Sequence, residues 1–448
     1  MDKKLINFFT LILIIILLYI FWKAEIVQKE PKSKYLIYYI VTGLLIILLN
    51  LLRFFRKHIR QNFLIVFINI VVCIYIVEFS LHFYYGSKDI GKNRNDKLEF
   101  IEDYKKFKND FKDGYPSWNG GYVKKDSVLG LKKDTYIFSG LANKDTMHCD
   151  EHNNKTIHYK KEHVYKSDRF GFNNPDFIYD ENKIKIILIG DSAVHSQCVS
   201  EQNGFAGNLK KLYGTNNILS IAWRGAGPLE ELGMLSEYAI KNKPEYILWV
   251  YAEINDYIEI FREQRNPILM NYLNDDFTQN LIYRNNHLNK VSKSIFDKKT
   301  SNFKLSWDEK NHFLSFIKHR IKLWKIRWTF FISHKYTPKI TNFDLEMFEQ
   351  ILIKAKKRSE SVNSKFIFVY LPEKQRYQKK NWDDKDLFKR EEVLNLVSSL
   401  SIPIIDLHEI FRKQTNPTTF FELHQNEKGY KISSEYIFNK MKRYKKTF

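Results

Sequence analysis

Short apolar runs of strand length recur through the second half of the chain, and stretches of helical character separate several of them. The runs lie at 184–189, 217–223, 246–252, 365–371 and 402–407. Between the second and third runs, residues 228–241 (PLEELGMLSEYAIK) begin with Pro228, a residue well suited to the first turn of a helix. Continuous β-branched and aromatic runs that alternate with helices predict an α/β domain with a parallel sheet covered on both faces.

The first 85 residues contain three longer apolar runs, at 5–22, 35–52 and 63–84. Each is close to the ~20 residues that a helix needs to cross a bilayer. A cleaved signal peptide is the alternative for the first run, but no small-x-small cleavage site follows it. Buried core helices are the alternative for all three, but short basic loops separate the runs. We therefore expect residues 1–85 to form a membrane anchor with three transmembrane helices.

Positive charge in the short loops predicts the orientation of this anchor. The loop at 53–61 (RFFRKHIRQ) has basic residues and no acid, so we expect it on the cytoplasmic side. The loop at 23–34 also carries lysines, but Glu25 and Glu30 accompany them. Three crossings then place the residues after about 85 outside the cytoplasm. Glu78 lies late in the third run, near an interface, where we expect it to face a neighbouring helix.

The rest of the chain divides into two parts. Residues 86–182 are polar, rich in turn residues and weakly periodic, which predicts an irregular approach segment with short strands. Residues 183–448 carry the alternation of strands and helices, interrupted by a helical insertion at about 266–343. Within the insertion, the aromatic and basic stretch 313–335 favours an amphipathic helix packed on the domain. A cap over the site and a helix lying on the membrane face are the alternatives.

A formal net charge of +21 raises the question of nucleic-acid binding. The basic residues are mostly lysines scattered along the whole chain, without an arginine-rich arm or a nucleic-acid motif, so we expect no nucleic-acid partner. The three cysteines are too few for a disulfide framework and lack the spacing of a metal site. Cys73 lies in an apolar run, whereas Cys149 and Cys198 could form one bridge in an oxidising compartment.

The stretch IILIGDSAVHS at 186–196 ends a strand-like run abruptly with Gly190, Asp191 and Ser192. All three are common turn residues, so the triplet has a purely structural interpretation. The functional interpretation is a nucleophile at the carboxyl end of a parallel strand, where open α/β sheets place their ligands. A serine nucleophile needs a base and donors for the oxyanion, which the rest of the chain would have to supply.

Suitable residues follow the later runs. Gly225 and Gly227 (AWRGAGPLEE) come after the second run and would let the backbone offer an amide to an oxyanion. Asn255 (YAEINDYIE) follows the third run and could donate its side-chain amide, or instead cap a helix. Near the C-terminus, FFELHQNEKGYKI offers His424 as a general base, with Glu422 two residues earlier as a candidate orienting carboxylate.

This order of blocks resembles the SGNH, or GDSL-type, hydrolase superfamily: Ser in Gly-Asp-Ser, then Gly, then Asn in Asn-Asp, then His. The resemblance covers roughly residues 160–442. The upstream SDRFGFNN (167–174) is similar to a segment of membrane-anchored members related to alginate and cell-wall O-acetyltransferases. The resemblance implies a flavodoxin-like α/β/α fold and action on acyl esters, often acetyl groups on extracytoplasmic glycans.

Carried over residue by residue, the resemblance makes Ser192 the nucleophile and His424 the base. The amides of Ser192 and Gly225 and the side chain of Asn255 would form the oxyanion hole. We expect neither a cofactor nor a metal. The residues expected to support these blocks are Gly190, Asp191, Gly227, Asp256 and Asn426.

Three positions depart from the family pattern. Ile254 stands where Gly usually precedes Asn, and Ser220 replaces the Asn that often opens the second block. The acid before the histidine is usually Asp, whereas here the nearest carboxylate is Glu422, with Asp406 (IIDLHEIF) as the second choice. The site is then a triad with an unusual acid, a Ser–His dyad helped by a backbone carbonyl, or a weakened site.

Two functions fit these residues. In the first, a membrane-anchored serine esterase or O-acyltransferase acts on O-acyl esters of extracytoplasmic glycans. As a transferase it would need a partner, a separate multi-span membrane protein that donates the acyl group. In the second, an SGNH-fold protein with weakened activity holds a glycan or an assembly partner. The substituted acid and Ile254 motivate the second function.

Overall fold

The five apolar runs form the strands of one sheet in a computed structural model of the chain. The structure describes residues 2–22, 24, 35–85, 91–149, 159–180, 183–301, 312–327, 329, 345–422 and 424–447. All neighbouring strands of the sheet run parallel, which confirms the predicted α/β class. The strands are β6 (Ile186–Gly190), β7 (Ile218–Ala222), β8 (Tyr246–Ala252), β9 (Lys365–Leu371) and β10 (Ile404–Asp406).

The strand order is β10-β9-β8-β6-β7, which puts the first strand of the domain inside the sheet. From β6 the chain crosses to β7 on one side, and it then adds β8, β9 and β10 on the other. Flavodoxin-like folds share this order, and their ligands bind where the direction of winding reverses. The reversal lies between β6 and β8, so the segments that follow these two strands border the expected ligand position.

Helices cover both faces of the sheet. Their bounds are α5 (Phe205–Tyr213), α6 (Pro228–Met234), α7 (Asp256–Glu263), α8 (Pro267–Asn271), α9 (Leu281–Ser301), α14 (Leu345–Glu360), α15 (Lys374–Tyr377), α16 (Arg390–Ser399), α17 (His408–Phe411) and α18 (Glu427–Thr447). Ile187 and Ile189 of β6 share a core with side chains of α6, α14 and α16. Ile186 and Leu188 share another with side chains of α5 and α18. The alternation along one strand therefore buries both of its faces, as a continuous apolar run requires.

The helix predicted over 228–241 is present, but only its first half is α-helical. After α6, Leu235–Ala239 continue as a π-helical turn and Ile240–Asn242 as a 3₁₀ turn. The hydroxyl of Ser236 donates to the carbonyl of Leu232, one turn earlier. Side-chain hydrogen bonds of this kind compete with the regular backbone ladder and bend helices.

The approach segment contains the expected short strands and also a long helix that its weak periodicity did not predict. The helix α4 spans Gly91–Asp110. Its apolar stripe is narrow, with Phe100, Tyr104 and Phe107 at spacings of four and three, and only Phe107 is fully buried among them. The short strands are β1 (Tyr115–Pro116), β2 (Gly121–Val123), β3 (Thr135–Ile137), β4 (Asp145–Met147) and β5 (Val164–Lys166).

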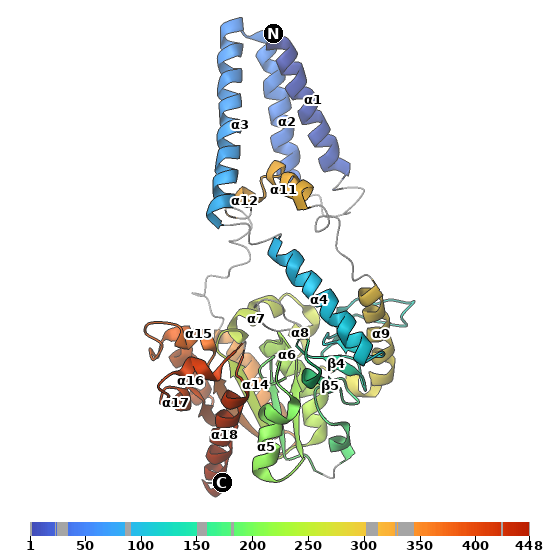
Figure 1. Cartoon of the computed structure of the whole chain (residues 1–448), viewed down its shortest axis with the longest axis vertical. Helices are drawn as coiled ribbons and strands as arrows, with labels where there is room; N and C mark the ends of the chain where they lie inside the picture. The colour runs from blue at the N-terminus through green and yellow to red at the C-terminus, as the bar shows by residue number, and fades with distance from the viewer. Residues whose placement is uncertain are drawn as a thin grey trace. The chain divides into compact units, whose positions relative to one another are not determined.

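The apolar runs at the N-terminus form three helices that pack side by side (Figure 1): α1 (Asp2–Phe21), α2 (Leu36–Leu51) and α3 (Lys57–Tyr85). By length and composition, Lys3–Phe21 and Lys57–Tyr84 are able to cross a membrane, whereas the apolar helix Tyr38–Phe54 is shorter. The expectation of three spans therefore narrows to two helices of sufficient length. A signal sequence near an N-terminus has the same length and composition as α1, so these properties alone do not make it an anchor.

The chain folds as two units, one of residues 1–88 and 311–334 and the other of residues 89–310 and 335–448. The helices α8 and α9 of the insertion belong to the second unit. The aromatic and basic stretch instead forms α11 (His312–Ile321) and α12 (Trp324–Arg327) in the first unit, where both contact α3. This stretch was expected to pack on the sheet domain. It docks on α3 instead, where Arg320 pairs with the buried side chain of Glu78. The end of the stretch and nearly all of the loop at 23–34 lie outside the described residues.

Candidate active site

Ser192 lies in a tight turn at the carboxyl end of β6, residues 191–195, here called the nucleophile turn after the role that the sequence predicts for Ser192. The amide of His195 donates to the carbonyl of Asp191 at 3.0 Å and closes the turn. Gly190 leaves the room that the turn needs, because a Cβ there would stand 2.4 Å from Cγ2 of Val194. The structural and functional interpretations of the triplet are therefore compatible: a turn is what presents the serine hydroxyl at the end of the strand.

Asp191 connects the serine to Asn255, which follows β8. Its Oδ1 accepts a hydrogen bond from the amide of Ala193 at 2.9 Å, and its Oδ2 accepts one from Nδ2 of Asn255 at 3.0 Å. The hydroxyl of Ser192 donates to the same Oδ2 at 3.4 Å. Asn255 directly precedes α7 but makes no side-chain cap to it. The strand order thus brings together residues that follow two neighbouring strands.

Asp256 fixes the turn that carries Asn255. Its Oδ2 accepts the amide of Ala252 at 2.9 Å, which holds the turn between β8 and α7. The side chain is fully buried, and burial, followed by the charge of Asp191, raises the pKa of its carboxyl well above the usual value. Asp256 therefore positions Asn255 rather than facing solvent.

His424 lies against a buried carboxylate that the sequence did not single out. Nδ1 of His424 is 3.7 Å from Oε1 of Glu373, and both side chains are largely buried. Glu373 comes directly after β9 and before α15. Burial raises the pKa of its carboxyl, the contact with His424 opposes this rise, and the charge of Asp191 adds to it. The His424–Glu373 pair therefore lies within electrostatic reach of the nucleophile turn.

The structure favours Glu373 over Glu422 as the acid that orients His424. The side chain of Glu422 is exposed, and only its backbone contacts the segment around His424. The amide of Glu422 donates to the carbonyl of His424 at 2.7 Å, and its carbonyl accepts from Nζ of Lys374 at 3.2 Å. These bonds form the turn that presents His424. The choice of Glu422 rested on nearness in sequence, and the fold brings a carboxylate from another strand to the ring.

A buried ion pair holds the segment that carries Glu373. Oε1 of Glu253, after β8, accepts the amide of Glu373 at 2.9 Å. Oε2 of Glu253 accepts Nε of Arg376 at 2.8 Å and the hydroxyl of Tyr370 at 2.6 Å. Both charged side chains are fully buried. Breaking such a pair from one side is costly, so the network makes the position of Glu373 rigid.

The two glycines after β7 have different roles. Gly225 is exposed and adopts a left-handed conformation with a φ of +67°, which glycine accepts without strain. Its carbonyl accepts a hydrogen bond from Arg262 at 3.0 Å. The amide of Gly227 donates to Oε1 of Glu263 at 2.8 Å, and a Cβ at Gly227 would stand 2.4 Å from Cβ of Glu259. Gly227 therefore supports the block, which leaves Gly225 as the candidate oxyanion donor.

Helix α18 and the turn before it contribute two further residues around the site. Asn426 accepts the amide of Gly429 at 3.1 Å through its side chain and donates to the carbonyl of Thr419 at 2.9 Å, so it forms the turn into the helix. The buried hydroxyl of Tyr430 donates to the carbonyl of Ala193 at 2.7 Å. Tyr430 thereby ties the last helix to the nucleophile turn, a role that its sequence context does not indicate.

A disulfide joins Cys149, just after β4, to Cys198 in the segment that follows the nucleophile turn. Beside it, His148 and His195 are fully buried, with ring centroids 4.6 Å apart. Nε2 of His148 donates to the carbonyl of Ser196 at 2.7 Å. Burial lowers the pKa of His148 to about 3 and that of His195 well below the usual value. Both rings are buried away from solvent, so His148 and His195 have a structural role beside this turn.

Asp406, the second-choice acid, is engaged elsewhere. Its carboxylate pairs with Arg390 and accepts the amide of His408 at 2.9 Å. These contacts give Asp406 a structural role at the end of β10. Within the described part of the chain, no group of three or more His, Cys, Asp or Glu side chains is arranged to hold a metal ion.

No family model and no curated protein matches the sequence. Among solved structures, the chain is similar to a G-D-S-L family lipolytic protein from Desulfitobacterium hafniense DCB-2, with 12% identity, a TM-score of 0.32, and coverage of 57% of this chain and 99% of that one. A lipase/acylhydrolase from Enterococcus faecalis has 13% identity, a TM-score of 0.32 and coverage of 58% and 95%. The acetyl xylan esterase AlAXEase has 11% identity, a TM-score of 0.32 and coverage of 57% and 98%. Scores this low carry no argument about function, which must come from the site.

Proposed function

We propose that the chain is a membrane-anchored serine esterase or O-acyltransferase of SGNH type that acts on O-acyl esters, in particular O-acetyl esters, of extracytoplasmic glycans. The observation that carries the proposal is the grouping at the carboxyl end of the sheet. Ser192 follows β6, Asn255 follows β8, and the partner of His424 follows β9. Open α/β sheets bind their ligands at this end.

In the first half-reaction, Oγ of Ser192 forms a bond to the carbonyl carbon of the ester while His424 takes the hydroxyl proton. The hydroxyl donates to Asp191 in the structure, so a rotation of the Ser192 side chain has to redirect it toward His424. The bond from the carbonyl carbon to the leaving alcohol then breaks, and His424 returns the proton to the leaving oxygen. The product is an acyl-serine and a free hydroxyl on the glycan.

The oxyanion that forms in this step needs donors. Asn255 has two N–H groups on Nδ2, and one of them donates to Asp191. That bond sets the plane of the amide and leaves its second N–H for the oxyanion. The backbone amides of Ser192 and Gly225 are the other proposed donors.

Glu373 orients the ring of His424 and stabilises the imidazolium that forms when the ring takes the proton. Because its carboxylate is buried and lies next to Nδ1, Nε2 of His424 is the nitrogen that is left to exchange the proton with Ser192. The absence of a suitable acid near His424 in sequence was the main reason to consider a weakened, glycan-binding protein. Glu373 supports the enzyme over that alternative.

The second half-reaction transfers the acyl group to water or to a sugar hydroxyl, and both acceptors use the same acyl-serine. An acyltransferase would receive its acyl group through a separate multi-span membrane protein. The apolar helices α1 and α3 support a membrane anchor, and the basic loop at 53–61 supports an orientation with the sheet domain outside the cytoplasm. The Cys149–Cys198 bridge agrees with an oxidising compartment on that side.

A fluorophosphonate probe tests whether the site is an activated serine. On the proposal, the full chain in detergent is labelled at Ser192, and His424→Ala abolishes the labelling. The Ser192→Ala variant is the control for labelling elsewhere. A folded protein that resists the probe would instead favour the glycan-binding alternative.

A further inference from the structure

Glu78 is an acid near the end of the apolar helix α3, and the structure shows what it binds. It lies on α3 with no exposed surface, and its Oε1 is 3.0 Å from a guanidinium nitrogen of Arg320 on α11. Its two oxygens also accept the backbone amides of Lys325 at 3.0 Å and Ile326 at 2.8 Å on α12. A buried charge persists only where it is paired and hydrogen-bonded, so Glu78 specifies the docking of residues 312–327 on α3.

Residues 312–327, here called the α11–α12 segment, contact all three N-terminal helices. The hydroxyl of Tyr75 on α3 donates to the carbonyl of Ile321 at 3.3 Å. Nζ of Lys322 lies 6.0 Å from the ring centre of Tyr19, near the end of α1, and the guanidinium of Arg327 lies 5.8 Å from that of Tyr38, near the start of α2. Tyrosines concentrate where membrane helices meet the headgroup layer. The segment therefore covers one end of the helix bundle at a belt of tyrosines.

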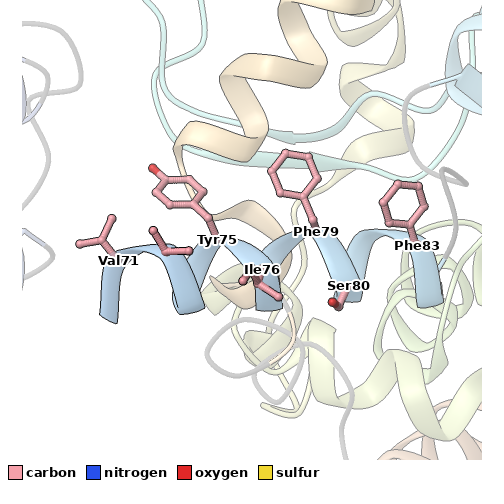
Figure 2. A pocket seen from close by; sticks show the side chains of 7 residues that line it. Val71, Tyr75, Ile76, Phe79, Ser80 and Phe83 are labelled. Carbon is pink, nitrogen blue, oxygen red and sulfur yellow. The ribbon is translucent and has the colours of Figure 1, made fainter. Parts of the chain in front are cut away.

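One side of the α11–α12 segment is both apolar and exposed. Leu314, Ile317 and Ile321 lie on one face of α11 and are 51%, 36% and 64% exposed. Next to them, an open groove of about 420 Å³ runs along α3 between Val71 and Phe83. Figure 2 shows Tyr75, Phe79 and Phe83 in a row along one side of this helix. Tyr75, which lines the groove, donates its hydroxyl to the carbonyl of Ile321, so the groove borders the exposed face at that residue.

The charge of the segment points to the chemistry of its partner. Residues 312–327 (HFLSFIKHRIKLWKIR) contain five Lys and Arg residues and no acid. Exposed apolar side chains beside a basic, aromatic stretch are typical of helices that lie in the headgroup layer of a bilayer.

We propose that the α11–α12 segment is an interfacial lipid-binding element. The apolar face of α11 and the α3 groove accept acyl chains of bilayer phospholipids, and Lys322 and Arg327 bind the phosphates of anionic headgroups. Glu78 holds the segment at the level of these headgroups. The inference rests on the proposed membrane anchor, and it adds a lipid contact made by the middle of the insertion, more than 220 residues after α3.

Spin labels on the full chain in lipid nanodiscs test the proposal. Cys73 is the free cysteine among the described residues, so a Cys73→Ser background leaves the introduced cysteine as the labelling site while Cys149 and Cys198 stay bridged. Labels at Ile65→Cys, Ile321→Cys and Val128→Cys are compared by their collisions with oxygen and with an aqueous nickel chelate. Ile65 reports the membrane anchor itself, and Val128, 93% exposed in the other unit, reports water.

On the proposal, the Ile65 label is deep in lipid, the Ile321 label has intermediate depth, and the Val128 label is aqueous. Replacing neutral by anionic phospholipid reduces the collision rate of the Ile321 label with the chelate at least twofold, and Lys322→Glu with Arg327→Glu removes this difference. A deep Ile65 label with an aqueous Ile321 label overturns the inference but leaves the anchor. An aqueous Ile65 label removes the anchor and the inference with it. An Ile321 label shielded from both reagents means that protein covers the face, which also overturns the inference.

Discussion

Replacing Glu373 by Gln tests the proposed triad most directly. Gln has nearly the same size as Glu, so the substitution removes the charge and keeps the volume. In the structure, Oε1 of Glu373 is 3.7 Å from Nδ1 of His424, and the carboxylate is 5% exposed. The imidazolium that forms when His424 takes the serine proton would lose this stabilisation, whereas the neutral ring of the resting enzyme loses little. The effect therefore falls on turnover rather than on substrate binding.

The size of the effect follows from the geometry. Two unit charges 3.7 Å apart at an effective dielectric constant of about 20 attract by about 4.5 kcal/mol. Each 1.36 kcal/mol is a factor of ten in rate, so the predicted loss is roughly a thousandfold. This is somewhat smaller than the ~10⁴-fold loss for the corresponding carboxylate in a serine protease, where the substitution also imposes the wrong tautomer on the histidine.

The assay is steady-state hydrolysis of 4-nitrophenyl acetate by the purified full chain, with kcat and KM determined separately. Glu422→Gln is the matched control, because Glu422 is two residues from His424 but exposed, and its effect should stay under about threefold. Thermal melting checks that each variant is folded. Retention of most activity by Glu373→Gln, with Ser192→Ala inactive, would refute the triad and leave a Ser–His dyad. A large loss in Glu422→Gln alone would restore the acid that the sequence suggested.

Three further predictions concern stability and topology. The buried ring of His148 is neutral in the folded state, with its pKa lowered to about 3, so stability is lost as the pH falls below the unfolded value near 6.5. Between pH 6.5 and 5, protonation of this ring in the unfolded state alone lowers the free energy of unfolding by about 2 kcal/mol. His148→Gln should therefore flatten the pH dependence of the melting temperature, and an unchanged slope contradicts this prediction. Replacing Cys149 and Cys198 by Ser opens a bridge with a sequence separation of 49 and should lower stability by about 4 kcal/mol, measured by chemical denaturation, whereas an unchanged midpoint argues against a native bridge. In a Cys73→Ser background, a membrane-impermeant thiol reagent should reach Val128→Cys from outside intact cells and Phe54→Cys only after lysis; the reverse pattern inverts the topology.

Much of the domain is readable from the sequence because burial of both faces of a strand demands an uninterrupted apolar run. The five runs predicted as strands are the five strands of the sheet, and three of them, β7, β8 and β9, begin and end within one residue of the predicted bounds. Turn residues directly after two of these runs, at Asp191 and Asn255, point to the ligand end of the sheet. Strand content and local turns are set by neighbouring residues, which is why the sequence reveals them.

The approach segment and the insertion were less readable. Helix α4 has a narrow apolar stripe, so the hydrophobic periodicity of its sequence is weak. The stretch from 313 looks like any amphipathic helix. Contacts with α3 across more than 240 residues, such as the pairing of Arg320 with Glu78, decide that it docks there rather than on the sheet domain.

By itself, the sequence determined the strands, the nucleophile turn and the candidates Ser192, Asn255 and His424. The tertiary structure decided which carboxylate lies beside His424. Glu422 is near in sequence, but its backbone forms the turn and its side chain is exposed to solvent. Glu373 is 51 residues away (424 − 373) and reaches the ring because β8 and β9 are neighbours and Glu253 holds the segment after β9. A buried charge pair depends on which strands are adjacent, and adjacency is a property of the whole fold that local spacing does not encode.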